Sequence, residues 1–206
     1  MSCAPWRRSA VSTSSRQSST SSRGMPPSER RSSVPAVLIS LAEELDTHGH
    51  AESARQVLRR AVAWQRARSR DAQQAARARS ELARALYLLG EYDAAEPLFK
   101  ALSDAAPADR RFLLQLGLIA ARRGRPNEVA EVAERLRALK GPCDHGETAL
   151  ALARLSAALG DPDVAVGLLR QALGEGVGYG TWLHANTDLT PLRADPRFRE
   201  LVKPSG

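Results

Sequence analysis

The stretch LARALYLLGEYDAAEPLFKALSDAAP, residues 82–107, decides the fold that we expect for this chain. Its first half spaces apolar residues three and four positions apart, which places them on one face of an α-helix: Leu82, Ala83, Leu86 and Leu89. Gly90 then marks a turn. The second half runs to Pro107 with a second apolar face, made of Tyr92, Ala95, Leu98, Phe99 and Leu102. The stretch predicts two amphipathic helices joined by a tight turn.

The same pattern occurs four times along the chain. Its turn glycines are Gly49, Gly90, Gly124 and Gly160, and their separations are 41, 34 and 36 residues. A helix–turn–helix unit that recurs every 34 residues or so is typical of stacked helical repeats. The first separation is longer than the others, so we expect extra residues in the helix or loop around residues 64–75.

The copies resemble the tetratricopeptide repeat family, and the best of them covers residues 76–109. There Leu82-Ala83 is similar to the close-packed pair of the first helix, and residues 90–93 resemble the turn. Ala95 and Phe99 are the small and the large residue of the second helix. Small residues such as Ala83, Gly117 and Ala153 let two helices approach closely, and stacking completes the core.

The other copies cover residues 35–68, 110–143 and 146–173. All four lack the aromatic residue that is usual early in the first helix, where Leu38, Arg79, Leu113 and Ala149 stand. The resemblance implies an all-α, right-handed superhelical solenoid of about four helix hairpins over residues 34–174.

Residues 175–206 resemble a closing segment that is common after bacterial tetratricopeptide arrays. The resemblance rests on Trp182-Leu183, Asp188-Leu189, Pro191-Leu192-Arg193 and Asp195-Pro196-Arg197-Phe198. Physically the segment is typical of a helical cap, because Asp195 can act as an N-cap with Pro196 in the first turn. We expect Trp182, Leu189 and Leu192 to cover the open apolar side of the last repeat.

Residues 1–33 differ from the rest in composition and charge. They are rich in serine and arginine and carry a net charge of +5, whereas the remaining residues carry +2. A segment without apolar periodicity cannot bury enough surface to fold, so we expect a disordered tail. A targeting segment and a translation start at Met25 are alternatives that the composition leaves open.

Several features favour a cytoplasmic location. No run approaches the roughly 20 apolar residues that a membrane-spanning helix needs. The N-terminus also lacks the apolar core of a secretory signal. The two cysteines, Cys3 and Cys143, make neither a disulfide framework nor a paired metal motif, so a reducing compartment is the default interpretation.

The sequence predicts neither an enzyme nor a cofactor or metal site. Residues 174–178 (GEGVG) lack the Lys-Ser/Thr and the preceding strand of a phosphate-binding loop, so we interpret them as a flexible joint. His48 and His50 lie in one turn, and the run Cys143-Asp144-His145 lies in another repeat, without the spacing of metal ligands.

In the resembled family, the first helix of each pair lines a concave groove. Carried over position by position, the groove residues are Arg77, Ser80, Arg84 and Tyr87 in the second copy, Arg111, Leu114, Leu118 and Arg122 in the third, and Leu150 and Arg154 in the fourth. Arginine binds carboxylates through two parallel hydrogen bonds. We therefore expect a non-enzymatic scaffold that binds a protein or peptide with acidic and apolar residues. An equally weighted alternative is that these arginines only solvate helix faces.

A nucleic-acid-associated or regulatory role through the basic tail and residues 55–84 is the second functional hypothesis. Those residues contain nine arginines but one aromatic residue before Tyr87, Trp64, which offers little for base stacking. A nucleic-acid partner is therefore not the first expectation, and a long solvated helix is the preferred interpretation of the stretch.

Overall fold

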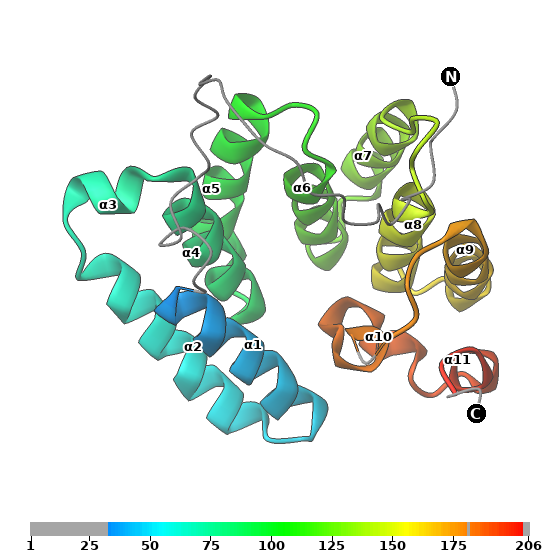
Figure 1. The fold of residues 1–206 in the computed structure, drawn as a ribbon, viewed down its shortest axis with the longest axis horizontal. Coiled ribbons are helices and arrows are strands. Elements are labelled where there is room, and N and C mark those ends of the chain that lie inside the picture. Colours follow the sequence, from blue (N-terminus) through cyan, green and yellow to red (C-terminus); the bar gives the residue numbers. More distant parts are fainter. Residues whose placement is uncertain (1–32, 181, 204–206) are drawn as a thin grey trace, which may run out of the picture.

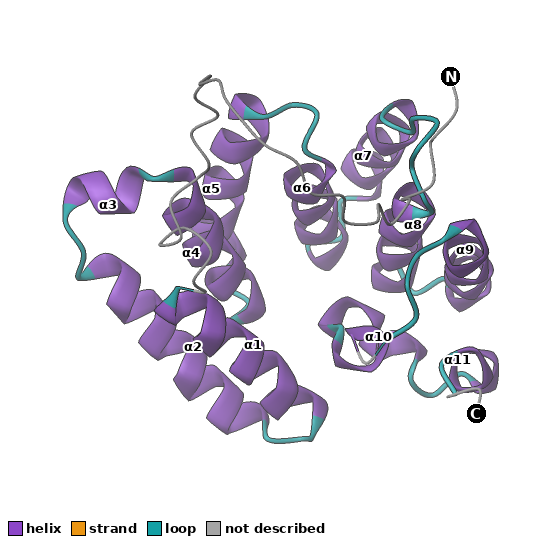
Figure 2. Cartoon of the chain, viewed as in Figure 1, coloured by secondary structure: helices purple, strands orange, loops and turns teal. Residues whose placement is uncertain are grey.

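The computed structural model describes residues 33–180 and 182–203, and within them all regular structure is helical (Figures 1 and 2). The tail that we expect at residues 1–33 lies almost wholly outside the described residues. The elements are α1 (Val34–Thr47), α2 (Ala51–Arg66), α3 (Arg70–Gln74), α4 (Ala76–Leu88), α5 (Tyr92–Ala105), α6 (Arg110–Arg122), α7 (Pro126–Ala138), α8 (Glu147–Ala158), α9 (Pro162–Glu175), α10 (Trp182–Ala185), the 3-10 helix η2 (Thr187–Leu192) and α11 (Pro196–Leu201).

Four consecutive helix pairs form the solenoid. The pairs α1/α2, α4/α5, α6/α7 and α8/α9 each pack against each other, and neighbouring pairs stack in chain order. The turn glycines of the four pairs have φ between 67° and 81°, a left-handed conformation that costs residues with a side chain free energy. The predicted all-helical array of four hairpins is confirmed.

The extra residues of the first interval form a short helix of their own. The chain leaves α2 at Arg66, passes through a turn and enters α3, which is capped by the Ser69 side chain. The Gln73 side-chain amide donates to the backbone oxygens of Arg66 and Arg68, at 2.9 and 2.6 Å, and ties α3 to the end of α2. The expected long helix is therefore wrong: residues 55–84 are divided among α2, α3 and α4, because the turn and the cap at Ser69 interrupt the helical pattern.

The core consists of two apolar clusters. The larger runs through the first three pairs and reaches α8, with Leu86, Phe99, Leu118 and Leu136 among its fully buried members. The smaller joins α8 and α9 to the C-terminal segment. In it Leu183, Leu189, Leu192, Phe198 and Val202 pack on alanines of α8 and on Val166 and Leu169 of α9. Apolar side chains of the C-terminal segment thus cover the last helix pair, and Trp182 lies partly buried at the edge of the same cluster.

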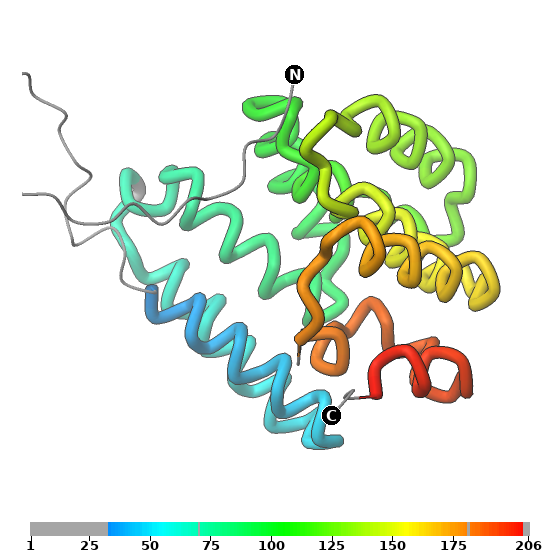
Figure 3. The backbone as a smooth tube through the Cα atoms, turned by 45° about the vertical axis from the view of Figure 1, so that its right-hand side comes forward, coloured from blue at the N-terminus to red at the C-terminus, as the bar shows by residue number. Residues whose placement is uncertain are grey.

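The C-terminal segment does more than close the last repeat. We call residues 182–192, which comprise α10 and η2, the strap. The strap lies on the inner side of the array and contacts α1 as well as α8 and α9 (Figures 1 and 3). After it, Asp195 accepts a hydrogen bond from the Arg197 backbone and caps α11, with Pro196 at its first position. The strap therefore bridges the first and last repeats across the concave face.

A cap on α9 offers a direct test of the helix boundaries. The Asp161 side chain accepts a hydrogen bond of 3.1 Å from the backbone N–H of Val164. Replacing Asp161 by alanine is expected to lower the free energy of unfolding by about 1 kcal/mol, the usual cost of losing an N-cap. Urea denaturation followed by circular dichroism measures the change. Asp161→Asn is the control, because asparagine keeps a side-chain oxygen that can cap and should lose much less.

Candidate binding groove

The concave face holds a hollow of about 400 Å³ between α1, α4, α6, α8 and the strap. Five of the ten groove residues predicted from the sequence line it: Arg84, Arg111, Leu114, Leu150 and Arg154. The hollow is also lined by residues outside the predicted groove, among them Arg110, Gln115 and Trp182. Its wall therefore combines four arginines and two glutamates, Glu43 and Glu147, with leucine and tryptophan side chains.

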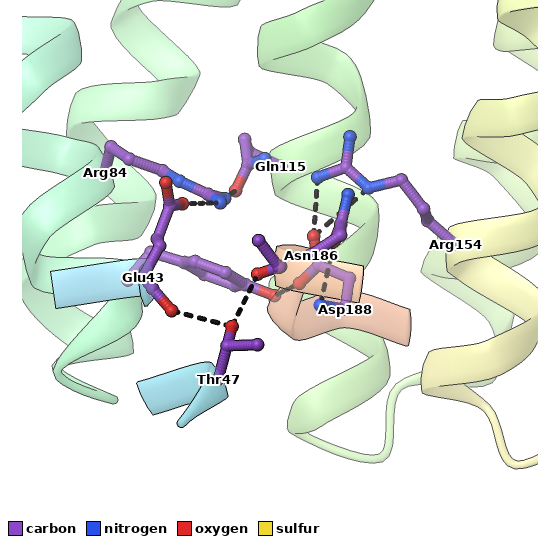
Figure 4. Close-up of polar contacts among 9 residues, drawn as sticks. Glu43, Thr47, Arg84, Gln115, Arg154, Asn186 and Asp188 are labelled. Carbon is purple, nitrogen blue, oxygen red and sulfur yellow. Dashed lines mark hydrogen bonds and ion pairs between the residues drawn. The ribbon is translucent and has the colours of Figure 1, made fainter. Parts of the chain in front are cut away.

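The first of these arginines links two repeats. Arg84 on α4 forms an ion pair with Glu43 on α1, with its Nη2 atom 2.6 Å from Oε1 (Figure 4). Its other terminal nitrogen lies 3.4 Å from the side-chain oxygen of Gln115 on α6. Because the guanidinium reaches α1 and α6, it connects three helix pairs at the base of the groove.

Asp188 of the strap is the most enclosed charged group of the described residues, and it lies against the predicted groove. Its side chain is fully buried. The Tyr87 hydroxyl donates to Oδ1 at 2.5 Å, and Arg154 donates to Oδ2 from Nη2 and Nε at 2.5 and 3.1 Å (Figure 4). Two residues predicted to bind a partner thus bind the chain's own C-terminal segment in this structure.

Burial and charge act in opposite directions on this cluster. Burial favours the neutral form of Asp188, but the positive charges of Arg154 and Arg84 and the hydrogen bonds from Tyr87 and Arg154 keep its pKa below the ordinary value. Burial also raises the pKa of the Tyr87 hydroxyl, and the carboxylate of Asp188 adds to that increase. At neutral pH the cluster therefore holds a charged carboxylate and a protonated tyrosine that donates to it.

The remaining predicted residues lie elsewhere. Leu118 is completely buried in the larger apolar cluster. Arg122 lines a second hollow of about 250 Å³, together with Tyr87, Thr187 and Asp188. Arg77 is exposed and pairs with Glu81 at 3.0 Å, and Ser80 is half-buried outside both hollows. The structure thus brings five of the ten residues to one hollow and separates the others from it.

Asp144, one of the residues considered for a metal site, has a structural role. Its carboxylate pairs with Arg110 and accepts hydrogen bonds from the backbone and hydroxyl of Thr148. The described residues contain no group of three or more His, Cys, Asp and Glu side chains placed to hold a metal ion. Cys143 is not a free thiol in the structure, and Cys3 lies outside the described residues. Within the described part of the chain, no helix combines the length and apolarity that crossing a membrane requires.

Comparison with known proteins identifies the repeats. The family model of the tetratricopeptide repeat matches residues 76–101 and 146–171. The first match lies on α4 and α5 and the second begins just before α8 and ends within α9, so both fall on helix pairs of the solenoid. Neither the curated proteins nor the solved structures include a match to this chain. The chain therefore contains tetratricopeptide repeats at α4/α5 and α8/α9, and the stack of four helix pairs supports a tetratricopeptide repeat protein.

Proposed function

We propose that this protein is a non-enzymatic interaction scaffold whose concave hollow binds a segment of another protein. The observation that carries the proposal is the lining of the hollow, where Arg84, Arg111 and Arg154 surround the apolar side chains of Leu114 and Leu150. Tetratricopeptide repeats suggest a role in protein–protein interaction. The lining selects a segment in which carboxylates stand next to apolar residues, because arginine pairs with carboxylates and the leucines provide an apolar surface.

The arginines of the hollow retain donors for such a partner. A guanidinium has five N–H donors. Arg111 uses Nε and Nη2 to bind Asp109, and its Nη1 has no hydrogen-bond partner among the described residues. Its side chain is 81% exposed, so it can turn toward an incoming carboxylate at little cost. Arg154 likewise binds Asp188 through Nε and Nη2 alone.

A charge reversal at Arg111 tests the proposal. A random peptide library displayed on phage is expected to yield binders in which Asp or Glu neighbours Leu, Ile or Phe. Synthetic copies of these peptides are expected to bind the Arg111→Glu variant about tenfold more weakly, or worse. The reason is that a hydrogen bond to a charged group contributes about 1.5–3 kcal/mol and each 1.4 kcal/mol is a factor of ten in Kd. Fluorescence anisotropy measures both affinities.

Arg170→Glu is the matched control. Arg170 is exposed on α9, lines neither hollow and forms no ion pair with another described residue. The same change of net charge there is expected to leave the affinity within about twofold, since isolated surface charges contribute little. Equal weakening by both variants would mean that the peptides respond to overall charge and not to the hollow. A selection without acidic and apolar enrichment would also contradict the proposal.

The second functional hypothesis, nucleic-acid association through the tail and residues 55–84, has less support in the described residues. The arginines of that stretch are distributed over three helices and the turn between α2 and α3. Several of them are paired: Arg55 and Arg59 with Glu52, Arg77 with Glu81, and Arg84 with Glu43. Binding of arbitrary DNA that falls steeply with salt concentration would favour this hypothesis over the scaffold.

A further inference from the structure

The strap is attached to the two sides of the groove by different kinds of contact. On the side of α8 and α9 its leucines Leu183, Leu189 and Leu192 are buried in the smaller apolar cluster. On the side of α1 and α4 the strap forms two polar side-chain contacts. They are the hydrogen bond from Tyr87 to Asp188 and a longer contact of 3.5 Å from the Thr47 hydroxyl to the backbone oxygen of Ala185 (Figure 4). The strap is therefore attached more firmly to the last repeat than to the first two.

If the strap separates from α1 and α4, Asp188 and Arg84 each keep an ion-pair partner. If α1 and α4 move away from the strap, Asp188 keeps both of its bonds to Arg154, which lies on α8. Arg84 likewise keeps Glu43, because both residues lie on the side that moves. Opening breaks the bond from Tyr87 and the weaker contact of Thr47, and it moves Asp188 away from the positive charge of Arg84. Water can replace both contacts, whereas removing a buried partner of a charge is far more costly.

The position of the strap controls access to the proposed site. Ala185 and Asn186 line the hollow of about 400 Å³, and Thr187 and Asp188 line the hollow of about 250 Å³ on the other side of the same segment. The strap thus forms a wall of both hollows. While it is held against α4, an extended peptide cannot run continuously along the concave face.

We propose that the contact between Tyr87 and Asp188 is a releasable clasp that keeps the groove closed, and that a partner segment binds the open form. The second half of this statement rests on the proposed function. A carboxylate of the partner would then take the place of Asp188 at the Tyr87 hydroxyl. The affinity measured for a partner is reduced by the fraction of molecules in which the clasp is closed, so weakening the clasp strengthens binding.

Tyr87→Phe tests the clasp in the full chain, because it removes the hydroxyl and keeps the ring. The readout is the rate at which a carbodiimide and an amine nucleophile label the carboxylate of Asp188, measured by mass spectrometry. We expect labelling about tenfold faster than in the wild type, the factor that corresponds to one hydrogen bond to a charged acceptor. Tyr92→Phe is the matched control, since the Tyr92 hydroxyl has no hydrogen-bond partner among the described residues and its ring lies 5.8 Å from that of Tyr87.

Two other carboxylates of the chain serve as controls that distinguish opening of the clasp from unfolding. Asp144 is buried in the α7–α8 connection, away from the clasp, and its labelling should stay slow, whereas exposed Glu200 should react equally in all variants. Labelling of Asp188 that stays at the wild-type rate in Tyr87→Phe overturns the clasp. If that variant labels Asp144 as well and is therefore unfolded, Thr47→Val replaces it. A rise of about twofold at Asp188 then supports the clasp, and no rise overturns it.

Peptide binding distinguishes the clasp from the proposed function. Peptides selected as above are expected to bind Tyr87→Phe several-fold more tightly than they bind the wild type. Equal affinities would overturn the gating role while leaving the scaffold function in place. Faster labelling of Asp188 together with no binding of any selected peptide would contradict the scaffold function and support the clasp.

Discussion

Replacing Asp188 by alanine is expected to lower the free energy of unfolding by about 3–5 kcal/mol, the range observed when one partner of a buried ion pair is removed. The substitution leaves Arg154 largely buried without its carboxylate and deprives the Tyr87 hydroxyl of its acceptor. It also removes the side chain that connects the strap to α4 and α8. Urea denaturation followed by circular dichroism gives the difference in free energy.

Asp163→Ala is the matched control for this loss. Asp163 forms an ion pair with Arg197 at 2.6 Å, but its side chain is 78% exposed. Exposed pairs contribute about 0–1 kcal/mol, so the control should change stability little. If both aspartate variants lost the same amount, burial of the Asp188 pair would not be the cause of its effect.

The contribution of Asp188 also depends on pH in a defined direction. Its pKa is below the ordinary value in the folded chain, so its charged form stabilises the fold at and above the unfolded pKa of about 3.9. This stability is lost as the pH falls below that value toward the folded pKa. The difference in stability between the wild type and Asp188→Asn should therefore be constant near neutral pH and shrink below about pH 4. A difference that grows in acid would contradict the direction of the shift.

The repeat architecture is readable from the sequence because it depends on local features. The turn glycines are needed where the backbone is left-handed, and each apolar face follows from spacing within one helix. The close approach expected at Gly117 is also confirmed, since a Cβ atom there would lie 2.7 Å from Cγ1 of Val132 and 2.9 Å from Cδ2 of Leu155. Each of these signals is contained within one or two repeats.

The candidate site is harder to predict from the sequence, because it is built by contacts between distant parts of the chain. Tyr87 and Asp188 are separated by 101 residues, and no periodicity relates them. The available signal was local: Asp188 stands beside Leu189 in a segment whose leucines were expected to be buried. A carboxylate there needs a partner, and the groove arginines and tyrosine are the groups that provide one.

The position of the strap also explains why Tyr87 and Arg122, two of the predicted groove residues, do not line the hollow of about 400 Å³. Transferring positions from a repeat family assumes that every first helix faces an open groove. In this chain the strap covers Tyr87 and separates Arg122 from the hollow of about 400 Å³. While the strap is closed, the partner surface that we propose is limited to the part of the groove that the strap leaves accessible.

Replacing Gly146 by alanine is expected to destabilise the last repeat by about 2–5 kcal/mol, for two additive reasons. Gly146 precedes α8 with φ of 82°, a left-handed conformation that costs a residue with a Cβ atom about 1–2 kcal/mol. The added Cβ would also lie 2.3 Å from the backbone oxygen of Ala172 on α9. Overpacking of this kind adds about 1–3 kcal/mol.

The clash cannot be relieved by a side-chain rotation, because its partner is backbone. The oxygen of Ala172 already accepts a hydrogen bond of 3.0 Å from Val177 in the turn that ends α9. Relief would require α8 and α9 to separate, and the apolar cluster that the strap shares with both helices would then open. Gly160→Ala isolates the first cause, since Gly160 has φ of 79° and nothing within 4 Å of the added atom. Urea denaturation should show a loss of about 1–2 kcal/mol for Gly160→Ala and a clearly larger one for Gly146→Ala; equal losses would mean that the contact with Ala172 relaxes without cost.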